Sequence, residues 1–209
     1  FAALVDDLAV IAADLGRRHP GLKRVLVGHS MGSFAAQAFM TRHPGAVDGV
    51  ALSGTTAVDM LGQAAASGSF RLEDLNQTIP DARTPFDWLS RDPAEVDAYI
   101  ADPECGWDAN VSMWKDIFRL IYAGGENVDR LPKRLPVHLL GGEADPATDN
   151  GKAVAALERR MKSAGMTDVA LTLLPDTRHE TLQELNREEA MSAFADWADR
   201  VTVSAKQPA

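Results

Sequence analysis

Short apolar runs alternate with segments of helical periodicity along most of this 209-residue chain. The apolar runs are expected to form strands and lie at residues 25–27, 50–52, 137–140 and 169–174. Helices are expected beside them, at residues 1–16, 34–40, 152–161 and 186–201. Buried strands that alternate with helices are typical of a parallel sheet covered by helices on both faces. The sequence therefore predicts an α/β fold.

The first expected helix is defined by leucine and isoleucine at helical spacing, namely Leu4, Leu8, Ile11 and Leu15. Gly16 is expected to end this helix with a left-handed cap. The segment contains three aspartates and has no basic residues before its apolar part, so it does not have the pattern of a signal peptide. The pattern predicts an amphipathic helix.

Residues 55–131 interrupt the alternation, because they contain no strand-like run and hold three of the four tryptophans. We interpret this stretch as a helical insertion. It would divide a partial α/β core into residues 1–54 and 132–203, and residues 204–209 would form a flexible tail.

The clearest helix of the insertion is expected to begin at Pro93, with Asp92 as its N-cap. Glu95 is placed to complete a capping box with Asp92. The apolar side of this helix would consist of Val96, Tyr99 and Ile100. A second helix is expected over residues 111–122.

Charge and composition exclude several classes of function. Lys and Arg number 21 against 30 for Asp and Glu, and this net charge of −9 argues against a nucleic-acid partner. The single cysteine, Cys105, cannot form an intramolecular disulfide, and no Cys/His cluster has zinc-ligand spacing. No apolar run approaches the ~20 residues of a membrane span. We expect a soluble, cytoplasmic protein without a metal or cofactor.

A G-x-S-x-G sequence at residues 28–32 connects the first expected strand to the following helix. In a nucleophile elbow, a strained turn exposes the serine hydroxyl, and the flanking glycines allow strand and helix to approach closely. We interpret Ser30 as the candidate nucleophile, and we expect both Gly28 and Gly32 to be required by close packing. The alternative is a glycine-rich turn that only leads the chain into the helix.

A serine nucleophile needs a base and a residue that orients the base. His179 follows the strand at 169–174, and Asp145 follows the strand at 137–140, so both are expected at the same sheet edge as Ser30. His179 could instead be a surface histidine, and Asp145 could simply cap a turn. Glu143 is a rival acid two positions away.

The segments GHSMGS, GGEADPATDNGKA and PDTRHETLQE resemble the nucleophile, acid and histidine segments of the α/β-hydrolases, in the chain order of that fold. Over nearly its whole length the chain resembles the monoacylglycerol lipase and lysophospholipase branch. The resemblance implies that Ser30 attacks an ester carbonyl, His179 is the base and Asp145 orients the imidazole. The backbone N–H of Met31 would be one oxyanion donor. The family takes its second donor from an earlier loop, which nothing in this sequence matches.

The same resemblance identifies residues 55–131 as a cap over the active site. Substrate contacts are expected from His29 in the elbow and from the cap residues Trp88, Trp107, Trp114 and Phe118. Phe70 and Met113 add apolar surface to the same cap. The alternative is that these side chains form the cap's own core.

Three functions remain open. The first is hydrolysis of carboxylic esters of the monoacylglycerol or lysophospholipid type. A peptidase of the same fold is the second, and it would need an acidic group placed for a substrate amino terminus. A non-catalytic binding protein that retains the fold is the third.

An α/β-hydrolase normally reaches its nucleophile after several strands, whereas here one expected helix and one expected strand precede Ser30. We therefore expect that the N-terminal strands of the fold are absent from this chain. The missing N-terminal segment of the same protein would pack against this chain as a partner and would cover the outer edge of the strand at 25–28.

Overall fold

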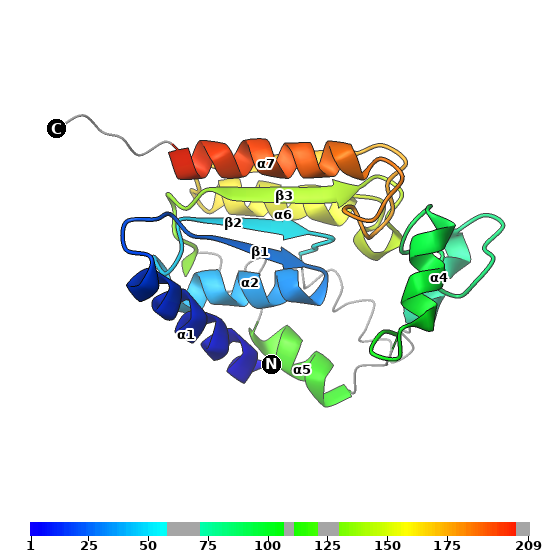
Figure 1. The fold of residues 1–209 in the computed structure, drawn as a ribbon, viewed down its shortest axis with the longest axis horizontal. Helices are drawn as coiled ribbons and strands as arrows, with labels where there is room; N and C mark the ends of the chain where they lie inside the picture. Colours follow the sequence, from blue (N-terminus) through cyan, green and yellow to red (C-terminus); the bar gives the residue numbers. More distant parts are fainter. Residues whose placement is uncertain (58–71, 107–110, 121–129, 204–209) are drawn as a thin grey trace.

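The computed structural model describes residues 1–57, 72–106, 111–120 and 130–203. Its centre is a sheet of four strands in the order β1-β2-β3-β4, and every neighbouring pair is parallel. The strands are β1 (Val25–His29), β2 (Gly49–Ser53), β3 (Val137–Gly142) and β4 (Val169–Leu174). All four carboxyl ends therefore lie at one edge of the sheet (Figure 1). The predicted α/β fold with a parallel sheet is confirmed.

Helices cover both faces of the sheet. Helices α2 (Met31–Arg42) and α6 (Lys152–Ser163) pack on one face, where their apolar side chains join those of β2, β3 and β4 in one buried cluster. Helix α7 (Arg187–Val203) packs on the other face, with Ala190 against Leu140 and Leu174. The middle strands β2 and β3 are buried at every position, which is why their sequences are mainly apolar. His138 of β3 is a buried polar exception, and its Nε2 lies 2.9 Å from Thr172 Oγ1.

Helix α1 (Ala2–Arg18) packs on α2, but of the stripe that the sequence predicts only Leu8 takes part in the contact. Val5 and Ala12 are buried against α2, whereas Leu4, Ile11 and Leu15 are exposed, with Ile11 54% exposed. The most deeply buried positions of α1 carry valine and alanine, whose small side chains allow the two helices to approach closely. Gly16 is also not a cap, because the helix continues to Arg18.

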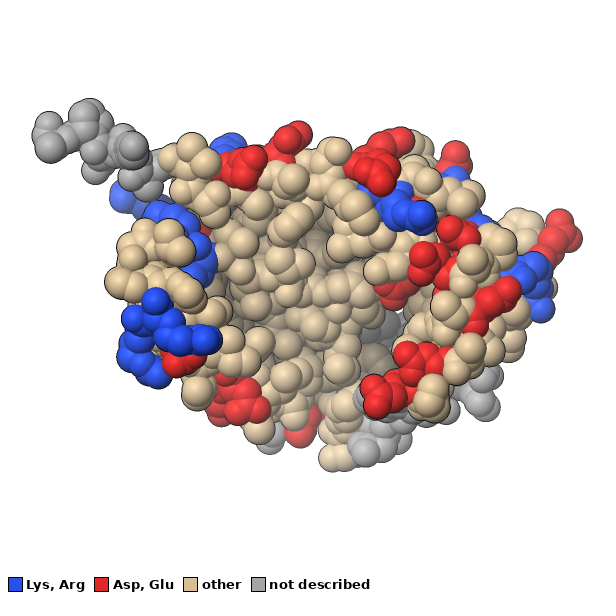
Figure 2. Space-filling view, viewed as in Figure 1, with Lys and Arg blue, Asp and Glu red and all other residues tan. Residues whose placement is uncertain are grey.

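Strand β1 is an edge strand of this sheet and pairs only with β2 among the described residues. Val27 is consequently 48% exposed, so the expectation that residues 25–27 are buried on both faces is wrong for this position. Figure 2 shows that the surface over β1 and α2 is hollowed and largely free of charged side chains. Charged residues surround this area on both sides (Figure 2).

Between β2 and β3 the structure describes η1 (Leu72–Thr78), α4 (Pro93–Ala101) and α5 (Val111–Leu120). Helix α4 lies beyond the carboxyl ends of the strands, whereas α5 lies beside α2 (Figure 1). Ile117 of α5 is buried with residues of α1 and α2. Residues 121–122, expected in the same helix, lie outside the described part of the chain.

The start of α4 agrees with the sequence in part. The Asp92 side chain accepts a hydrogen bond from the N–H of Ala94, as an N-cap does. The expected capping box with Glu95 does not form, because the N–H of Asp92 donates to Ser90 Oγ instead. Ile100 is exposed, so the apolar side of this helix is narrower than expected. None of the described helices has the length and hydropathy needed to cross a bilayer.

Candidate active site

Ser30 occupies the sharp turn between β1 and α2. Its backbone has a φ of 49°, in the left-handed region that non-glycine residues rarely adopt. The turn is held on both sides: the Ser30 N–H donates to Ser53 O over 3.0 Å, and Ser33 Oγ donates to Ser30 O over 2.6 Å. This strained turn directs the Ser30 side chain away from the strand, as a nucleophile elbow requires.

The two glycines of the elbow differ in what they do. A Cβ on Gly28 would lie 2.5 Å from Gly32 O and 2.9 Å from Ser33 Cα, so only glycine fits there. A Cβ on Gly32 would meet nothing within 4 Å. The expectation that close packing requires both glycines is therefore wrong for Gly32. Gly28 of the strand approaches the carbonyl group of Gly32, and the space where a Cβ of Gly32 would lie is open.

The side chains of Ser30, His179 and Asp145 form a continuous chain of contacts. His179 Nε2 lies 3.0 Å from Ser30 Oγ, and His179 Nδ1 lies 2.9 Å from Asp145 Oδ2. His179 is 3% exposed and Asp145 is fully buried. The three residues follow three different parallel strands, so the shared sheet edge brings them together.

Asp145 makes both of the contacts that the sequence analysis treated as alternatives, one to a helix N-terminus and one to His179. Its Oδ1 accepts from the N–H of Ala147 over 2.9 Å, which caps the short helix η3 (Pro146–Thr148). Its Oδ2 contacts His179. The cap fixes the carboxylate in the orientation that the imidazole needs. The rival acid Glu143 is exposed.

The surroundings of His179 favour its protonated form. Burial alone would lower the pKa of His179, but the charge of Asp145, the hydrogen bond to it and the charge of Glu180 outweigh burial. The pKa of His179 is therefore raised above its ordinary value. An imidazole with a raised pKa accepts a proton more readily than a free imidazole does.

The matching family model is described as serine aminopeptidase, S33, and it matches residues 1–186. The chain belongs to this family of α/β-hydrolases. The monoacylglycerol lipase of Mycolicibacterium smegmatis is 27% identical to this S33-family hydrolase over 199 residues, covering 94% of this chain and 69% of the relative.

Solved structures show the same fold. A thermostable carboxyl esterase from Bacillus coagulans has a TM-score of 0.79 at 22% identity, covering 95% of this S33-family hydrolase and 71% of the esterase. The monoglyceride lipase of Saccharomyces cerevisiae has a TM-score of 0.69 at 18% identity, covering 97% and 69% of the two chains. The chain is thus an α/β-hydrolase similar to monoacylglycerol lipases and esterases.

The structure places the other predicted site residues of this S33-family hydrolase in different surroundings. Trp88 is buried with its ring centroid 4.9 Å from that of His179, and its indole N–H has no partner among the described residues. Trp114 and Met113 pack against the cluster between α1 and α2. Met31 is the first residue of α2. Its N–H therefore has no carbonyl of a preceding helical turn to which it could donate a hydrogen bond.

Three of the predicted cap contacts cannot be placed. Phe70 and Trp107 lie outside the described residues. Phe118 belongs to α5, but its side chain is not described.

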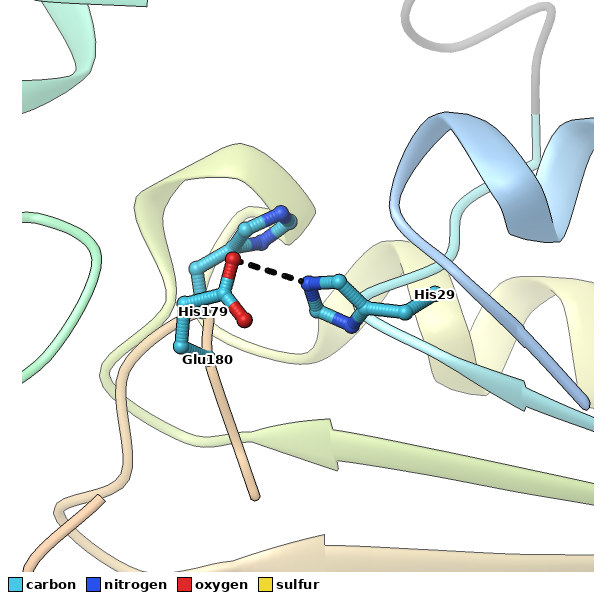
Figure 3. Close-up of side chains that lie close together, drawn as sticks. All are labelled: His29, His179 and Glu180. Carbon is cyan, nitrogen blue, oxygen red and sulfur yellow. Dashed lines mark ion pairs between the residues drawn. The ribbon is translucent and has the colours of Figure 1, made fainter. Parts of the chain in front are cut away.

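Sequence reasoning missed one pair at this site. His29, at the end of β1, lies with its Nε2 3.1 Å from Oε1 of Glu180, the residue after His179 (Figure 3). The rings of His29 and His179 are 5.0 Å apart. Burial would raise the pKa of Glu180, but its hydrogen bond to His29 and the nearby imidazoles lower it overall. The only sequence signal for this acid is its position next to the candidate base.

The loop that carries His179 is fixed to the segment before α4. The buried carboxylate of Glu184 accepts from the N–H of Arg178 and from Arg91. The N–H of Glu180 donates to Leu89 O over 2.8 Å. Residues on the two sides of His179 are therefore tied to the same short stretch at residues 87–91.

Proposed function

We propose that this protein is a serine hydrolase that cleaves carboxylic esters of the monoacylglycerol or lysophospholipid type. The observation that carries the proposal is the chain of contacts from Asp145 through His179 to Ser30. The lipase and esterase relatives support an ester as the substrate.

In the proposed mechanism, Ser30 Oγ attacks the ester carbonyl carbon while its proton moves to His179 Nε2. The tetrahedral intermediate collapses, the C–O bond to the alcohol breaks, and the alcohol leaves with that proton. Water then attacks the acyl-enzyme, with His179 again as the base, and releases the acid and Ser30. Asp145 orients the imidazole and stabilises its charged form.

The N–H of Met31 is proposed as one donor to the oxyanion of the intermediate. It is the first N–H of α2, where the helix dipole also favours negative charge. Residues 55–131 are proposed as a cap. Within it, the contact of Trp88 with His179 favours Trp88 as a lining residue, and its indole N–H, which has no partner among the described residues, could donate to a substrate oxygen. The contacts of Trp114 favour a packing role.

A second candidate function is peptide hydrolysis at an amino terminus. The observation that favours it is Glu180, a partly exposed carboxylate beside His179 that could bind a substrate ammonium group. A free amino terminus would then compete with His29 for this carboxylate.

The deciding experiment is labelling with a fluorophosphonate probe, which reacts with activated serines. We expect stoichiometric labelling at Ser30, none in Ser30→Ala, and none in His179→Ala. A folded wild-type protein that is not labelled would favour the non-catalytic alternative.

The substrate class is tested on wild-type protein that reacts with the fluorophosphonate probe. Monoacylglycerols, lysophospholipids and p-nitrophenyl esters of increasing chain length are compared with aminoacyl anilides. Faster hydrolysis of the anilides, lost in Glu180→Gln but not in the matched Glu143→Gln variant, would replace the esterase proposal by the peptidase.

A further inference from the structure

His29, His179 and Glu180 bring two imidazoles and a carboxylate together at the carboxyl edge of the sheet (Figure 3). One ligand atom from each lies within 4.8 Å of the other two. His29 comes from the end of β1, whereas His179 and Glu180 come from the loop between β4 and α7. Two imidazoles and one carboxylate are a donor set that Zn²⁺ uses with an open fourth position.

We propose that these three side chains form a binding site for a divalent transition metal ion, with Zn²⁺ the preferred ion, and that the bound metal inhibits the enzyme. The metal site includes the candidate base, His179, as one of its ligands. Its inhibitory effect rests on the proposed function, whereas the binding of the metal does not.

The contacts of His179 determine how it would bind the metal. Asp145 holds Nδ1, which leaves Nε2 as the nitrogen that can exchange its contact with Ser30 for a metal. A carboxylate on the far nitrogen of a ligating histidine is the usual outer partner in zinc sites, where it fixes the tautomer and increases the basicity of the ligand. The same carboxylate that prepares His179 as a base therefore prepares it as a ligand.

The other two ligands can reach the metal with small movements. Ligand atoms of a tetrahedral zinc site lie about 3.4 Å apart, given metal–ligand distances of about 2.1 Å. His29 Nε2 and Glu180 Oε1 already lie 3.1 Å apart. Both side chains are partly exposed, at 31% and 27%, so they can rotate toward His179 without opening the core.

The surrounding backbone keeps the three residues together. The N–H of Glu180 is held by Leu89 O, and a Cβ on Gly54 would lie 2.9 Å from Cε1 of both His29 and His179. Glycine at position 54 therefore leaves the space in which the two rings approach.

Binding is measured by isothermal titration of ZnCl₂ into chelator-treated protein at neutral pH. We expect one ion per chain in the wild type, and an affinity lower by at least about tenfold in Glu180→Gln and in His29→Ala, since loss of an outer partner alone costs about 10–100-fold. The matched controls are Glu143→Gln, an exposed acid after β3, and His19→Ala, an exposed histidine after α1. Equal binding in all five proteins, or no stoichiometric binding in the wild type, would overturn the site.

Labelled histidine resonances give a readout that does not depend on turnover. Zn²⁺ should shift the ring signals of His29 and His179 and leave those of His19 and His138 unchanged. In parallel, Zn²⁺ should inhibit ester hydrolysis in proportion to occupancy, and a chelator should restore it. Binding at these histidines in a protein without hydrolase activity would contradict the proposed function and leave the metal site standing. Full activity with the site occupied would refute inhibition.

Discussion

The buried carboxylate of Glu184 holds Arg91 in two places: its Oε1 accepts from the Arg91 N–H over 3.0 Å, and its Oε2 accepts from Arg91 Nε over 2.9 Å. The same Oε1 also accepts from the N–H of Arg178. This side chain thus joins the segment before α4 to the residue that precedes His179. Its role is to position that loop, because its hydrogen bonds within the described residues go to the loop and to Arg91, and none goes to Ser30 or the imidazole.

Glu184→Gln should lower the free energy of unfolding by roughly 2–3 kcal/mol, because charge-assisted hydrogen bonds in a buried network are lost. The exposed Glu189→Gln, on α7, should change it by less than about 0.5 kcal/mol. Urea denaturation measures both. A positioning role predicts further that folded Glu184→Gln loses turnover rate and that the pH midpoint of its activity moves. An unchanged pH profile would reduce the role of Glu184 to stability alone.

Asp145→Asn should lower the turnover rate by roughly 10³–10⁴-fold, because an amide in place of the carboxylate no longer holds the imidazole in the reactive tautomer. Asparagine can still cap η3, so the fold should be retained. Glu143→Gln removes an acid two positions away and should leave the rate within about twofold. The hydrolysis rates of the two purified variants are compared with that of the wild type. A larger loss of rate in Glu143→Gln than in Asp145→Asn would show that Glu143, and not Asp145, is the acid.

Hydrolysis should increase with pH, because His179 must be neutral to accept the proton of Ser30. Since the pKa of His179 is raised, the midpoint of kcat/KM should lie above the ordinary histidine value of about 6.5. The charge of Glu180 contributes to this increase, so Glu180→Gln should move the midpoint to lower pH. The rate is measured in a pH-stat by titrating the released acid, because the absorbance of chromogenic products itself changes with pH. A midpoint below 6 in the wild type would contradict this electrostatic account.

The two elbow glycines should respond oppositely to substitution. Gly28→Ala forces a methyl group onto the backbone of Gly32 and should destabilise the protein by about 1–3 kcal/mol or more. Gly32→Ala should stabilise it by about 0.4–1 kcal/mol, because Gly32 lies in α2 with open space at its Cβ. Chemical denaturation compares them directly. An equal loss of stability in both variants would contradict this prediction and show that the turn is crowded at Gly32 as well as at Gly28.

Much of the fold could be predicted from local patterns. Each middle strand is buried on both faces, so its sequence is mainly apolar, and each residue of the Ser30–His179–Asp145 chain lies in the turn or loop after a strand. Parallel strands bring such positions to one edge without any knowledge of long-range contacts. The geometry of this part of the site therefore follows from strand order alone.

Other features depend on contacts between distant residues and left no local pattern. His29 ends strand β1 and Glu180 lies in the loop after β4, and each resembles an ordinary polar residue in its own segment. Glu184 and Arg91 are likewise separated by half the chain. In α1, helical spacing predicted an apolar face, but it could not identify which apolar side meets α2. That choice is made by the close approach of the two helices, which small side chains allow.

The open side of β1 has a consequence for handling this polypeptide in solution. Within the described part of the chain β1 pairs with β2 alone, and Val27 is exposed; an outer strand edge of this kind is a template on which the strands of other molecules can add. Concentrated samples should therefore develop light scattering, and Val27→Lys should suppress it, because ordered stacking would bring the ammonium groups together. Val203→Lys, which adds the same charge at the exposed end of α7, should have little effect. Since Val27 has no part in the contacts among Ser30, His179 and Asp145, the lysine variant should keep its reaction with the fluorophosphonate probe and become the more practical form for crystallisation.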